Sequence, residues 1–73
     1  MYIIIEMQTN NGSTTVVTPI KSEAEENKAL NKYYETLAAA AISSVEIHTV
    51  MLITEAGQVA RCETFEHKTE VGE

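Results

Sequence analysis

The chain has 73 residues, a formal net charge of −6 and one cysteine, with 11 acidic residues against 5 Lys and Arg. A domain of this size buries only about 60% of the surface that its unfolded chain exposes, so partner subunits, metals or disulfides commonly stabilise it. A single cysteine excludes an internal disulfide and indicates a reducing compartment. The acidic balance argues against binding of duplex nucleic acid, which needs a basic surface.

The N-terminal third predicts a hairpin. Residues 2–7 are rich in β-branched side chains and favour a strand. Residues 8–13 form a turn cluster, in which Asn11 and Gly12 tolerate positive φ. Residues 14–18 are the returning strand, which Pro19 ends because it cannot donate to a ladder. There is no signal peptide at the start and no apolar run as long as a membrane span, so we expect a soluble protein of the cell interior.

The middle of the chain predicts one helix over residues 23–42. Ser22 and Glu25 have the spacing of a capping box. Adjacent tyrosines on a helix point about 100° apart, so we expect one of the two to pack on the sheet and the other to reach an edge or an interface. The predicted buried stripe consists of Leu30, Tyr33, Tyr34, Leu37, Ala40 and Ala41.

Residues 45–54 and 58–66 predict a second hairpin, turning at Gly57 in the left-handed region. The first of these strands is apolar on both faces, because side chains alternate between faces along a strand. The register of a three-residue turn implies four facing pairs, which are Ile53 with Val59, Leu52 with Ala60, Val50 with Cys62, and Ile47 with Phe65. A two-residue loop would shift this pairing.

These elements predict an α+β domain over residues 1–67, with a frayed acidic C-terminal tail at 68–73. The order is ββαββ, a four-stranded and mainly antiparallel sheet with one helix packed on one face. We expect the helix on the bulky side, which carries Ile47, Met51 and Ile53. The smaller side is then left open, which predicts a homodimer or higher homo-oligomer through sheet packing or edge pairing.

Candidate chemistry is sparse. His48 and Cys62 are predicted to lie diagonally on one face, but a structural zinc site needs four ligands. The chain has no aspartate and no cofactor-binding motif, so we expect no enzyme activity, no cofactor and no metal. The candidate interface or ligand contacts are Tyr34, His48, Val50, Leu52, Ala60 and Cys62.

Several segments carry a resemblance, and the most specific is Leu-Ala-Ala-Ala-Ala-Ile-Ser-Ser-Val-Glu-Ile-His at 37–48. The others are Ile-Glu-Met-Gln-Thr-Asn at 5–10, Ala24-Glu25, Tyr34, Cys62 and His67. In these the chain resembles short uncharacterised proteins encoded by phages and prophages of Gram-positive gut bacteria. The resemblance implies a protein of the bacterial host cytoplasm or of the virion, and it assigns no functional residue.

The leading functional hypothesis is a non-enzymatic phage accessory protein that acts by protein–protein contact and inhibits a host (defence) factor. One alternative is a structural or assembly protein of the virion. Another is a sponge that binds a small nucleotide signal at a subunit interface near Tyr34 or His48, where an exposed tyrosine can stack on a base.

Overall fold

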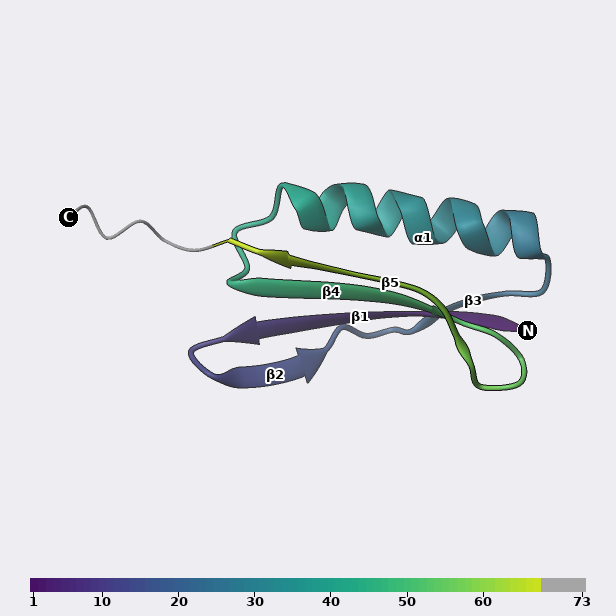
Figure 1. Cartoon of the computed structure of the whole chain (residues 1–73), viewed down its shortest axis with the longest axis horizontal. Coiled ribbons are helices and arrows are strands. Elements are labelled where there is room, and N and C mark those ends of the chain that lie inside the picture. The colour runs from purple at the N-terminus through teal and green to yellow at the C-terminus, as the bar shows by residue number, and fades with distance from the viewer. Residues whose placement is uncertain (68–73) are drawn as a thin grey trace.

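The computed structural model describes residues 1–67 and shows one helix packed against one antiparallel sheet (Figure 1). This confirms the predicted α+β class and the ββαββ order, to which the sheet adds one short strand. The predicted tail at 68–73 lies outside the described residues. The elements are β1 (Tyr2–Asn10), β2 (Ser13–Val16), β3 (Lys21–Glu23), α1 (Glu26–Ala41), β4 (Ile47–Ile53) and β5 (Val59–Glu66).

The strand order is β2-β1-β4-β5, and β3 also pairs with β1. β2 covers the C-terminal half of β1 and β3 covers its N-terminal half, so two short strands share one edge. β3 was not predicted from the sequence, because Lys-Ser-Glu has low strand propensity. Backbone pairing with β1 holds residues 21–23 in a strand despite their low propensity.

The first hairpin closes at the predicted Asn-Gly pair. Asn11 has φ 55° and Gly12 has φ 79°, and Asn10 lies opposite Ser13 across the turn. This tight turn leaves Gln8 and Thr9 in the ladder, so β1 runs three residues further than the predicted strand at 2–7. β1 is therefore long enough to pair with three other strands.

The helix begins later than predicted. Ser22 belongs to β3, so the capping box does not form, and the N-cap residue is Glu25, which makes no side-chain capping bond. At the other end, Ile42 is the C-cap, and the backbone N–H of Ser43 donates to the carbonyl of Ala40 at 3.3 Å. Pairing with β1 thus wins over local capping for residues 21–23.

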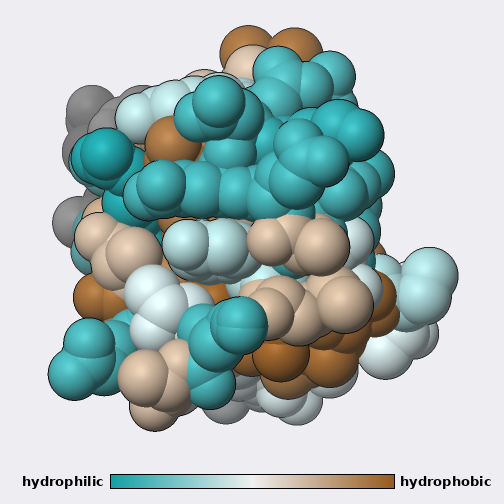
Figure 2. All heavy atoms as spheres, turned by 90° about the vertical axis from the view of Figure 1, so that its right-hand side faces the viewer, coloured by the Kyte–Doolittle hydropathy of each residue, from teal (hydrophilic) through white to brown (hydrophobic). Residues whose placement is uncertain are grey.

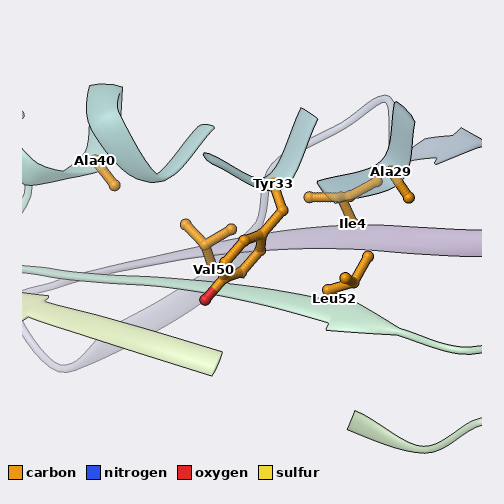
Figure 3. Packing of buried hydrophobic residues seen from close by; sticks show 6 residues of the cluster. All are labelled: Ile4, Ala29, Tyr33, Ala40, Val50 and Leu52. Atoms are coloured by element: carbon orange, nitrogen blue, oxygen red, sulfur yellow. The ribbon is translucent and has the colours of Figure 1, made fainter. Parts of the chain in front are cut away.

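The core lies between α1 and the even-numbered residues of β1 and β4. Figure 3 shows the ring of Tyr33 reaching from α1 toward the sheet, between Val50 and Leu52. The predicted stripe is partly wrong, because Tyr34 and Ala41 are exposed while Ala29 and Thr36 are buried. The buried apolar residues are Ile4, Ala29, Tyr33, Ala40, Val50 and Leu52.

The prediction that the helix covers the bulky side of β4 is wrong. Val50 and Leu52 are 0% and 2% exposed beneath α1, whereas Met51 and Ile53 lie on the other side. The helix presents small Ala29 and Ala40 to the sheet, and the large Tyr33 ring fills the remaining space. The bulk in the core therefore comes from the helix, which suits the smaller face of β4.

A β-bulge in β5 corrects the predicted pairing. Ile53 faces Val59 as predicted, but Leu52 faces Arg61, so Ala60 is an extra residue. A shift of one residue moves every later side chain to the opposite face. The predicted pairs Leu52–Ala60, Val50–Cys62 and Ile47–Phe65 are therefore wrong, and the observed pairs are Leu52–Arg61, Val50–Glu63, Met51–Cys62, His48–Phe65 and Ile47–Glu66.

Candidate functional site

The first candidate surface is the sheet face turned away from α1, which we call the open face. Ile5 lies directly opposite Met51, and Ile3 directly opposite Ile53, so these side chains shield one another and are only half-buried. Figure 2 looks at the end of the molecule where α1 begins: hydrophilic atoms predominate in the upper part of this view, and hydrophobic atoms gather at its lower right. The apolar members of the open face are Ile3, Ile5, Met7, Val16, Ile47, Met51, Ile53, Val59 and Cys62.

Hydroxyl groups on the open face are paired with each other. Thr9 and Thr14 share a hydrogen bond of 2.7 Å, and Thr49 and Thr64 share one of 3.1 Å. Because a satisfied hydroxyl needs fewer water molecules, these pairs lower the cost of covering the face. Val16 and Val59 are 46% and 54% exposed at its margins. The open face is thus an apolar surface with few unmet polar groups.

A second cluster joins the helix end to the sheet through His48. Its Nε2 lies within 2.5 Å of Glu6 Oε2, and its Nδ1 lies 2.9 Å from the hydroxyl oxygen of Ser43. Hydrolases use serine, histidine and carboxylate in such a chain. Here His48 is 3% exposed, and the Ser43 oxygen also accepts the Val45 N–H at 3.3 Å. The cluster therefore ties the end of α1 to β1 and β4.

A shallow hollow lies between α1 and β5. Its volume is about 260 Å³, just below the range of about 300–1,000 Å³ that is usual for ligand pockets. The rings of Tyr33 and Tyr34 meet edge to face at its rim, with centroids 5.3 Å apart. The hollow is lined by Tyr33, Tyr34, Leu37, Ala60, Arg61, Cys62 and Glu63.

The predicted contact residues divide between two places. Tyr34, Ala60 and Cys62 all border the hollow, although Cys62 occupies an open-face position opposite Met51, and Tyr34 is 49% exposed. His48, Val50 and Leu52 lie beneath α1 and are at most 3% exposed. Ile3, Ile5 and Met7 were missed as surface residues, although their alternation with Ile4 and Glu6 along one strand is a signal for a two-sided strand.

Tyr33 should make stability fall at alkaline pH. Burial raises the pKa of its hydroxyl above the ordinary 10.0, and the negative charge of Glu63 acts in the same direction. The folded chain thus prefers the neutral hydroxyl, so this contribution is complete below about pH 10 and is lost as pH rises through 10 toward the folded-state pKa. Urea unfolding at about pH 9 and about pH 11 should show a smaller loss for Tyr33→Phe than for the wild type. Equal losses would contradict this assignment.

The predicted His48–Cys62 pair does not exist. His48 points under α1 and Cys62 belongs to the open face, because the bulge at Ala60 moves Cys62 across the sheet. Within residues 1–67, no three His, Cys, Asp or Glu side chains lie together in a way that could hold a metal ion. None of the helical segments in this part of the chain is long and apolar enough to cross a membrane.

Comparison with protein-family models found no matching family, and comparisons with curated proteins and with solved structures found no significant match.

Proposed function

We propose that this protein is a non-enzymatic phage accessory protein whose open face binds a host protein. The single observation that carries the proposal is the apolar surface centred on Ile5 and Met51, which α1 leaves uncovered. Contiguous apolar patches of this kind mark interaction sites on small proteins. The phage setting comes from the sequence resemblance.

The negative charge of this chain indicates a partner with a basic surface. The chain carries a net charge of −6, and Glu66 lies opposite Ile47 at the margin of the open face. Complementary charge speeds association and selects partners. A host protein with an apolar patch bordered by lysine and arginine fits this surface. Binding covers that patch on the host protein and so inhibits the function that depends on it.

The test is to thin the apolar centre without breaking the sheet. The double variant Ile5→Thr/Met51→Thr places β-branched threonine, which favours strands, at both positions while removing apolar area. We expect the wild type, expressed in host cells and affinity-purified, to retain a specific basic-surfaced protein that the double variant loses. Quantitative mass spectrometry measures the loss, and hydrogen exchange on the reconstituted complex should show protection of β1 and β4.

The matched control is Ile42→Thr, because Ile42 is 87% exposed at the end of α1 and lies outside the open face. This variant should retain the partner as the wild type does. Circular dichroism must show that all three proteins are folded. Recovery of the same partner by the double variant, or protection confined to α1, would contradict the proposal. Finding the protein in purified virions would favour an assembly role instead.

A further inference from the structure

The edge strand β5 has unused backbone groups on a regular run of residues. The N–H of His67 donates to the carbonyl of Glu46 at 2.7 Å, which fixes the alternation of the β4–β5 ladder. In an antiparallel pair every second residue exchanges hydrogen bonds with its partner strand. Phe65, Glu63 and Arg61 therefore bond to β4, and the backbone groups of Cys62, Thr64 and Glu66 point away from the sheet.

The two edges of the sheet are unlike. One edge consists of β2 with 4 residues and β3 with 3 residues, separated by a segment that contains Pro19. Short strands and proline protect an edge from pairing with another chain. β5 has 8 residues and no proline, so within the residues that the structure describes the opposite edge of the sheet is one longer strand, paired with β4 on its inner side only.

The charges on β5 favour one antiparallel register for self-pairing, because only an axis through Cys62 pairs Arg61 with Glu63. Arg61 and Glu63 lie opposite Leu52 and Val50, so both belong to the helix side of the sheet and flank Cys62. A two-fold axis through Cys62 places Arg61 of each subunit opposite Glu63 of the partner subunit, which gives two pairs of opposite charge. An axis through Arg61 or through Glu63 would place like charges opposite each other, which is unfavourable.

We propose that two copies of this chain pair antiparallel through β5, centred on Cys62, to form one continuous sheet. Such an interface is isologous, as is usual for homodimers. The hollows beside Tyr34 then border a shared floor made by the two β5 strands, and the two open faces become one surface. The pairing is independent of the host partner proposed above, because it uses the edge of the sheet and requires only this protein.

Charge reversal tests the register in the purified protein. Sedimentation velocity over a concentration series should give a dimer for the wild type. Arg61→Glu or Glu63→Arg alone sets like charges opposite each other, and we expect the dimer dissociation constant to rise at least about tenfold. The double variant Arg61→Glu/Glu63→Arg restores opposite charges in reversed order and should return the dissociation constant toward that of the wild type. A purely structural effect of either substitution would not be rescued in this way.

A thiol crosslink tests the position of the axis. Directly opposite residues that exchange hydrogen bonds have α-carbons about 5.5 Å apart, so a short bismaleimide should join Cys62 to Cys62 of the partner subunit. Moving the thiol in the variant Cys62→Ala/Thr64→Cys should abolish most of the crosslink. A monomer at every concentration, preferential crosslinking of the moved thiol, or failure of the charge-reversed double variant to recover would overturn the proposal. So would a dimer that only Ile5→Thr/Met51→Thr dissociates, because that result assigns the contact to the open faces.

Discussion

Tyr33→Ala should remove a large part of the stability of this domain, whereas Tyr34→Ala, one residue later, should remove little. Tyr33 is 2% exposed in the centre of the core, and Tyr34 is 49% exposed. Truncation of a large buried aromatic side chain typically costs about 3–5 kcal/mol. A chain of this length is expected to have about 4–11 kcal/mol in total. We therefore expect Tyr33→Ala to lose a large part of its free energy of unfolding, about 3–5 kcal/mol.

Urea unfolding followed by circular dichroism measures both variants at one fixed protein concentration, since self-association shifts apparent stability. Tyr34→Ala should lie within about 1 kcal/mol of the wild type, as surface substitutions usually do. Tyr33→Phe separates the ring from its hydroxyl and should retain most of the stability at neutral pH. Equal destabilisation by Tyr33→Ala and Tyr34→Ala would mean that the helix is rotated relative to the described packing.

Sequence reasoning could not tell these two tyrosines apart. Helical spacing placed both in one stripe, and their separation depends on the rotation of α1 about its axis, which is fixed by contacts with the sheet. Ala29 and Thr36, which are 0% and 4% exposed, mark the side of α1 that faces the sheet. The hydroxyl of Thr36 bonds to the carbonyl of Lys32 at 2.8 Å and accepts from Lys21 at 2.9 Å, so a polar residue occupies a core position that the apolar pattern had passed over.

Turn chemistry was the most predictable part of the fold. Asn11, Gly12 and Gly57 all have positive φ, as their residue types indicated, and both hairpins close where expected. The bulge at Ala60 was not predictable, because one inserted residue depends on how β4 and β5 twist together and leaves no compositional mark. That single residue accounts for the wrong faces of Cys62 and Phe65, and hence for much of the misplaced candidate site.

The link between Glu6 and His48 was hidden for a different reason. The two residues are 42 positions apart, and they meet only because β1 pairs with β4. Strand order is set by tertiary packing, which local patterns do not encode. The sequence marks His48 as a candidate ligand, whereas no local pattern distinguishes Glu6 from the other glutamates. Because His48 is buried and contacts Glu6, each side chain satisfies the polar group of the other.

The second large effect is therefore expected from this pair, and it should be strongly non-additive. His48→Ala removes a buried ring and leaves the Glu6 carboxylate and the Ser43 hydroxyl without their partner, which we expect to cost about 3 kcal/mol. Glu6→Ala costs less, because the Glu6 side chain is 18% exposed and water replaces part of the interaction. Once either residue has been replaced, replacing the other costs little further stability, because their contact is already lost. The double variant Glu6→Ala/His48→Ala should thus be more stable than the sum of the single losses predicts, by about 1–3 kcal/mol.

Urea unfolding of the four proteins gives this coupling energy directly. Additive losses would mean that His48 contributes through packing and Ser43 alone, and that the carboxylate beside it does not hold the sheet to the helix end.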